Sequence, residues 1–93
     1  IILTGSALTN VNNNTILGVG TDGINVSNVL GLTIDGNSVT GAGDDGIDVN
    51  GVIGYNISGN AVALSGDNGI ELSNAALGLV GGNLIGLSGG DGI

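Results

Sequence analysis

The 93-residue chain contains no Cys, Pro, Met, Trp or Phe, and it contains no Lys, Arg or His. Without cysteine it can form neither disulfides nor thiolate metal sites. Its net charge of −8 argues against nucleic-acid binding, which depends on Lys and Arg neutralising phosphates. The same charge disfavours anionic membrane surfaces, and no apolar run is long enough to predict a membrane-spanning helix. We therefore expect no nucleic-acid partner and no membrane insertion.

What the chain has in abundance is repetition. The triplet Asp-Gly-Ile begins at Asp22, Asp45 and Asp91, and Asn68 begins the variant Asn-Gly-Ile, so successive triplets lie 23 residues apart. Cutting before each Ile gives four coils, 1–23, 24–46, 47–69 and 70–92, and Ile93 opens another. A constant period of this length predicts one structural unit stacked on copies of itself. We therefore expect residues 1–93 to form a single solenoid domain or part of a longer one.

Each coil holds three short apolar stretches separated by Gly and Asn. In coil 24–46, apolar and polar residues alternate over 24–27, 32–35 and 38–40, which is the periodicity of β-strands. No window has helical spacing, and the 21 Gly together with many Asn supply the left-handed conformations that tight corners require. The prediction is an all-β solenoid with three short strands per coil, stacked at about 4.8 Å.

Two recurring elements carry a family resemblance that covers the whole chain. They are Gly36-Asn37-Ser38-Val39 and Gly43-Asp44-Asp45-Gly46-Ile47, each with counterparts in other coils. The pattern resembles the right-handed, single-stranded parallel β-helix of the pectin-lyase-like superfamily. That resemblance implies a structural asparagine ladder at Asn14, Asn37, Asn60 and Asn83. It does not fix a function, because enzymes, adhesins and phage fibres share this fold.

Three acidic residues resemble part of a catalytic site. Asp22, Asp44 and Asp45 match the stacked carboxylates of polygalacturonases, in which one acts as general acid and others activate water. The His, Arg and Lys elements of that family are absent here, and no corner is long enough to shape a substrate groove. We therefore predict no catalytic residue and no enzyme activity. The alternative is a non-catalytic stretch of a polysaccharide lyase or glycoside hydrolase.

The same column of acids suggests a metal site. Stacked carboxylates repel each other, and a hard cation such as Ca²⁺ would relieve that repulsion with oxygen ligands. The candidate ligands are Asp22, Asp44, Asp45, Asp67 and Asp91, with the centre of the site between Asp44, Asp45 and Asp67. The alternative is that Asp-Gly forms a solvated corner.

Apolar residues at the ends and in the last coil suggest an assembly interface. The candidates are Ile1, Ile93, Leu77, Leu79, Leu84 and Leu87. Because no cap precedes Ile1 or follows Ile93, we expect either further β-helix coils or identical subunits stacked end to end. Tyr55, the single aromatic residue, is interpreted as a surface or interface residue.

Composition and resemblance together favour a secreted or cell-surface bacterial protein. The predicted function is structural or adhesive: an adhesin or exoprotein stalk, or a filament subunit that stacks end to end. A host surface or a polysaccharide is the expected partner. No cofactor is expected apart from Ca²⁺.

Overall fold

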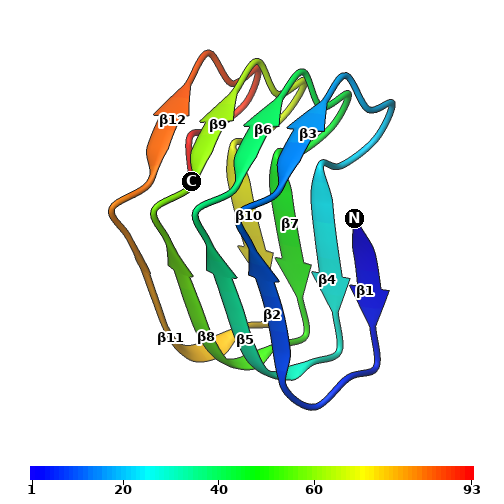
Figure 1. Ribbon diagram of the computed structural model, residues 1–93, viewed down its shortest axis with the longest axis vertical. Coiled ribbons are helices and arrows are strands. Elements are labelled where there is room, and N and C mark those ends of the chain that lie inside the picture. The colour runs from blue at the N-terminus through cyan, green and yellow to red at the C-terminus, as the bar shows by residue number, and fades with distance from the viewer.

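The computed structural model describes residues 1–93 as twelve short strands, with three strands in each of four stacked coils. Figure 1 shows the coils side by side, with the first in blue and the last in orange. The structure contains no helix of a length and hydropathy that would cross a membrane. The all-β solenoid with three strands per coil is confirmed.

Equivalent strands of successive coils pair in parallel and form three four-stranded sheets. Sheet A contains β1 (Ile2–Thr4), β4 (Ile24–Ser27), β7 (Ile47–Asn50) and β10 (Ile70–Ser73). Sheet B contains β2 (Thr9–Asn12), β5 (Leu30–Asp35), β8 (Ile53–Ser58) and β11 (Ala76–Gly81). Sheet C contains β3 (Thr15–Leu17), β6 (Ser38–Thr40), β9 (Ala61–Ala63) and β12 (Leu84–Gly86).

The strands pair in the register that the repeat predicts. Ile24 lies opposite Ile47, which lies opposite Ile70, and the same 23-residue offset holds in sheets B and C. Like residues therefore stack on like residues along the axis. A stack of this kind fills the interior with β-branched side chains that match the pleated surface.

One core column lies at a corner that the sequence analysis did not assign to the interior. Val29 and Val52 are completely buried where the chain turns from sheet A into sheet B. They join the buried columns that begin at Val11, Ile24, Val26 and Val39, together with Leu32 and Ala42, in one cluster of 14 buried apolar residues. The core therefore extends into this corner as well as between the sheets.

Left-handed backbone conformations mark the corners. The residues at positions 5, 28, 51 and 74 have φ between 50° and 69°, and all four are Gly or Asn, as expected. Three leucines are exceptions. Leu77, on β11, has a φ of 60°. The other two, Leu64 and Leu87, lie in the corner after sheet C and have φ of 59° and 54°. Their counterparts in the first two coils are Gly18 and Gly41, which also have positive φ.

Candidate functional site

The acidic residues gather at the corner between sheets C and A. In the second coil this corner runs from residue 41 to 46, between β6 and β7, and it carries Asp44 and Asp45. Gly46 follows, and a Cβ at this position would lie 2.6 Å from the carbonyl oxygen of Gly69 in the next coil. The glycine is therefore required by close approach between coils. Its φ is not left-handed, so the expectation of a turn glycine does not apply at this position.

One column of side chains at this corner links successive coils. The Asp22 Oδ1 atom accepts a hydrogen bond from the backbone N–H of Asp45 at 3.1 Å. The Asp45 Oδ1 atom accepts from the N–H of Asn68 at 2.8 Å, and Asn68 Oδ1 accepts from the N–H of Asp91 at 2.9 Å. Asp45 is thus buried with its charge hydrogen-bonded, as buried polar groups generally are. The first residue of the triplet therefore links each coil to the next, through the side chains of Asp22, Asp45 and Asn68.

Carboxylates form two close groups around Asp45. Oxygen atoms of Asp22, Asp44 and Asp45 lie within 4.8 Å of one another, and the same holds for Asp45, Asp48 and Glu71. Asp67 and Asp91, which the sequence analysis also proposed as ligands, belong to neither group. Asp45 belongs to both groups, and the second group adds Asp48 and Glu71 on sheet A, which were not among the predicted ligands.

The sequence analysis did not propose Asp48 and Glu71 as ligands, because the first two coils carry Ile2 and Asn25 at this position and the column is not uniformly acidic. Asp48 and Glu71 face each other across β7 and β10, and Asn25 occupies the same position on β4. The Asn25 amide donates to Asp22 Oδ2 at 2.7 Å and to Asp48 Oδ2 at 3.0 Å. Aligning residues 25, 48 and 71 would have revealed this acidic column from the sequence.

Mutual repulsion changes the proton affinity of this corner. The charge on Asp45 is the main cause that raises the pKa of Asp44. The same charge, together with burial and a hydrogen bond to Asp45, raises the pKa of Glu71. Burial is the main cause that raises the pKa of Asp48. All three shifts have the sign expected for acids that lack a cationic partner.

Chemically, the corner offers several carboxylate oxygens within reach of one small ion, and Ca²⁺ accepts ligands of this type. It contains no cationic group that could bind an acidic sugar, because the chain has none.

The asparagine ladder lies at the opposite corner, between sheets B and C. Asn14 Nδ2 donates to Asn37 Oδ1 at 3.0 Å, and Asn37 Nδ2 donates to Asn60 Oδ1 at 2.9 Å. Asn60 Nδ2 continues the ladder to Asn83 Oδ1 at 2.9 Å. Each receiving Oδ1 also accepts the backbone N–H of the preceding asparagine. These amides are therefore occupied by the protein itself and have a structural role.

The predicted assembly residues lie at the surface. Leu77, Leu79, Leu84 and Leu87 are each more than 70 % exposed, and Ile1 and Ile93 are also exposed. They do not form one face, because β11 belongs to sheet B and β12 belongs to sheet C. Any partner that covers all of them must contact two sheets or the end of the stack.

Comparison with known proteins agrees with this geometry. The sequence profile of the right-handed β-helix region matches residues 1–93, which is the full length of the chain. The chain belongs to the right-handed β-helix family. No curated protein and no solved structure matches it. Membership fixes the path of the chain in this β-helix, but it does not select among the functions that the fold supports.

Proposed function

We propose that this β-helix is a structural and adhesive segment of an extracellular or cell-surface bacterial protein. It would serve as an adhesin or exoprotein stalk, or as a filament subunit stacked end to end. The observation that carries the proposal is the unbroken 23-residue register through all three sheets. A segment of this kind contributes length and stiffness, because every coil repeats the contacts of its neighbours.

The hydrogen bonding supports a mechanical role. Three backbone ladders and two side-chain columns, one of asparagines and one of mainly acids, connect each coil to the next. Pulling two coils apart would break all of these bonds together. Further coils, or identical chains, would extend the same sheets if they continued the register of β1 at one end or β10 at the other.

The composition makes the chain resistant to trypsin-like proteases, and this property supports the proposed extracellular setting. Trypsin-like proteases cut after Lys or Arg, and the chain offers neither. Short corners also leave little flexible backbone for other proteases to bind.

The second candidate function is a non-catalytic stretch of a polysaccharide lyase or hydrolase. The observation that favours it is the approach of Asp22, Asp44 and Asp45 to within 4.8 Å, because this cluster resembles the carboxylates of glycoside hydrolases but lacks any cationic side chain beside it. The hydrogen bond from the Asp45 N–H to Asp22 gives this column a structural use that does not depend on catalysis.

Antibodies raised against residues 1–93 test the proposal on cells that produce the native protein. Surface labelling of intact cells, together with weaker adhesion in the presence of the Fab fragments, is the expected result. Labelling that requires permeabilised cells would refute the surface role. Release of unsaturated products or reducing ends from polysaccharides by the native protein would favour the enzyme alternative.

A further inference from the structure

A shallow groove of about 300 Å³ lies on the outer face of sheet C, over β9 and β12. Its lining is mainly apolar and includes Ala61, Ala63 and Leu84, while Ser38 and Thr40 belong to the neighbouring strand β6. No residue that lines the groove is charged. Leu84 is exposed, so the chain itself leaves most of this side chain uncovered.

Two further leucines extend the apolar surface into the corner that follows sheet C. Leu64 directly follows β9 and Leu87 directly follows β12, and both side chains are exposed. Both residues have left-handed backbone conformations, which leucine adopts only at an energetic cost. The first two coils build the same corner with Gly18 and Gly41, which adopt this conformation freely. The fold therefore does not require these two leucines, and residues held in a strained conformation are frequently found at functional sites.

The same corner carries exposed acids beyond the leucines. Asp67 lies three residues after Leu64, so at most about 11 Å of chain separates them. Asp91 lies four residues after Leu87, and both acidic residues are exposed. No Lys, Arg or His occurs anywhere in the chain to neutralise them. A partner that covers the apolar surface therefore meets uncompensated negative charge at its edge.

Charge decides which class of partner fits this surface. A second copy of the chain could cover the leucines, but it would bring a charge of −8 against a charge of −8 and has no cationic side chain to offer. An anionic partner would be repelled in the same way. A polypeptide segment with both apolar and cationic side chains satisfies both parts, because the apolar groups bury the leucines and the cations face the acids.

We propose that this leucine surface, made of the sheet C groove with Leu64, Leu84 and Leu87, binds a cationic, apolar segment of another protein. Apolar side chains of the segment would cover the three leucines, and its Lys or Arg side chains would reach Asp67 and Asp91. The inference rests on the adhesive role proposed above, for which it supplies a partner class.

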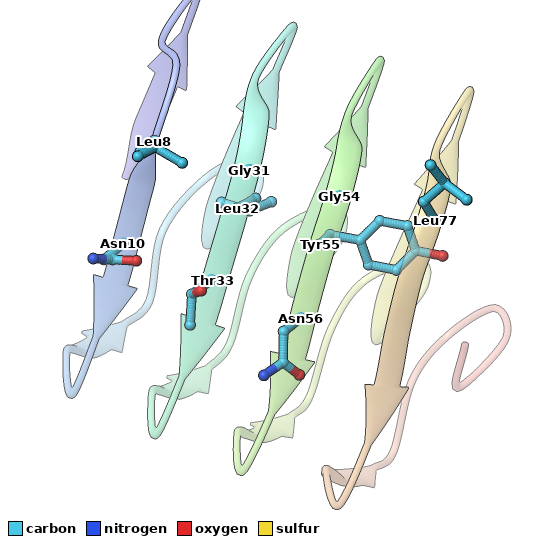
Figure 2. Close-up of a pocket in the computed structure, with 9 residues that line it drawn as sticks. All are labelled: Leu8, Asn10, Gly31, Leu32, Thr33, Gly54, Tyr55, Asn56 and Leu77. Atoms are coloured by element: carbon cyan, nitrogen blue, oxygen red, sulfur yellow. The ribbon is translucent and has the colours of Figure 1, made fainter.

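A second groove, on the outer face of sheet B, provides the comparison. Figure 2 shows Asn10, Thr33 and Asn56 in a row across its strands, so polar side chains interrupt its apolar lining. Leu8 lies at this groove and is exposed, as the three leucines of the leucine surface are. Replacing Leu8 therefore removes an exposed leucine from the same chain without changing the leucine surface.

The test uses synthetic peptides as defined partners. Fluorescein-labelled peptides of four Lys-Leu-Ser, Glu-Leu-Ser or Lys-Ser-Ser repeats are titrated with the 93-residue chain, and binding is followed by fluorescence anisotropy. Saturable binding of the Lys-Leu-Ser peptide is expected, about tenfold or more tighter than that of the other two peptides and weakened by about 0.5 M NaCl. The absence of saturable binding, or equal binding of either comparison peptide, would overturn the proposal.

Matched variants locate the site. Leu64→Gly combined with Leu87→Gly should weaken binding of the Lys-Leu-Ser peptide about tenfold or more, because the buried leucine area is lost. The same double variant should not lower the urea midpoint, because glycine relieves the left-handed strain, so weaker binding cannot be ascribed to unfolding. Asp67→Asn should weaken binding about twofold to fivefold at low salt.

Leu8→Ser is the control for the leucine variants and should leave peptide binding unchanged. Equal effects of Leu8→Ser and of the double glycine variant would overturn the assignment to the leucine surface.

Two further outcomes separate this inference from the proposed function. Surface labelling of cells together with no peptide binding would remove this partner and leave the structural role intact. A concentration-dependent increase in mass that Leu84→Ser abolishes, and with which the Lys-Leu-Ser peptide does not compete, would assign the surface to a second copy of the chain and would also overturn the inference.

Discussion

Replacing Asn60 with alanine should destabilise the protein far more than any exposed substitution. The Asn60 Oδ1 atom accepts two hydrogen bonds from Asn37, and its Nδ2 donates to Ile34, Ser58 and Asn83, all at 2.9–3.0 Å. Five bonds are lost, and the buried N–H of Asn37 loses its acceptor. We estimate a loss of roughly 3–5 kcal/mol from the net value of such bonds and the cost of an unpaired buried group.

Asn14→Ala is the matched control at the end of the same ladder. Its side chain donates to only two acceptors, Asn37 Oδ1 and the Asn12 carbonyl oxygen, in a more exposed setting. The expected cost is about 1 kcal/mol. Urea unfolding followed by far-ultraviolet circular dichroism measures both variants. With a slope of about 1.5 kcal/mol per M, Asn60→Ala should lower the midpoint by about 2 M or more.

A difference of less than about 1 kcal/mol between the two variants would contradict this prediction, because several hydrogen bonds separate them. Asn60→Asp provides a second check, because a carboxylate keeps the shape and the acceptor but cannot donate. It should lose the three donor bonds and be destabilised at neutral pH, whereas a neutral effect would mean that the ladder contributes little.

Three other changes test separate parts of the structure. Leu64→Gly should raise the free energy of unfolding by about 0.5–1 kcal/mol in urea titrations, because it removes a side chain from a left-handed residue; a destabilised variant would contradict this. Because the pKa values of Asp44, Asp48 and Glu71 are raised above 3.8, 3.8 and 4.5, these three groups contribute most to stability below these values, and their contribution is lost as pH rises through the folded-state pKa values; Glu71→Gln should flatten the urea midpoint against pH, and an unchanged slope would contradict this. At a dissociation constant of about 1 mM for Ca²⁺ at the acidic corner, 10 mM Ca²⁺ should increase the free energy of unfolding by about 1.4 kcal/mol and raise the Tm. Asp44→Asn should abolish this increase, and an unchanged Tm of the parent chain would contradict the prediction.

The fold could be predicted almost completely because each structural position occurs four times in the sequence. Four versions of each position reveal which columns are apolar and which are Gly or Asn, so strand, corner and register follow together. The burial of Val29 and Val52 was not recognised because their counterparts, Ser6 and Ala75, make the column look irregular. Those counterparts lie in the end coils, where fewer neighbours cover the corner.

The candidate sites were less predictable. Column alignment identified the acids of the triplet, but their hydrogen bonds to backbone N–H groups depend on corner geometry that spacing alone does not give. The shallow groove on the outer face of sheet B has Tyr55 in its lining, and its shape depends on where the Tyr55 ring packs over Gly78 of the next strand. The rotamer and the packing of this ring cannot be predicted from the sequence. Left-handed Leu64 and Leu87 contradict residue preference and follow only from their alignment with Gly18 and Gly41.

We infer that the 23-residue register, rather than any one site, holds this molecule together. The most direct measurement inserts a second copy of residues 24–46 after Gly46 and follows urea unfolding, with the same 23 residues in scrambled order as the control. The duplicated coil should be accepted as a fifth coil, raising the midpoint and increasing the urea slope by about a quarter, while the scrambled insert lowers the midpoint. A duplicated chain that is no more stable than the parent, or that behaves like the scrambled one, would contradict the account.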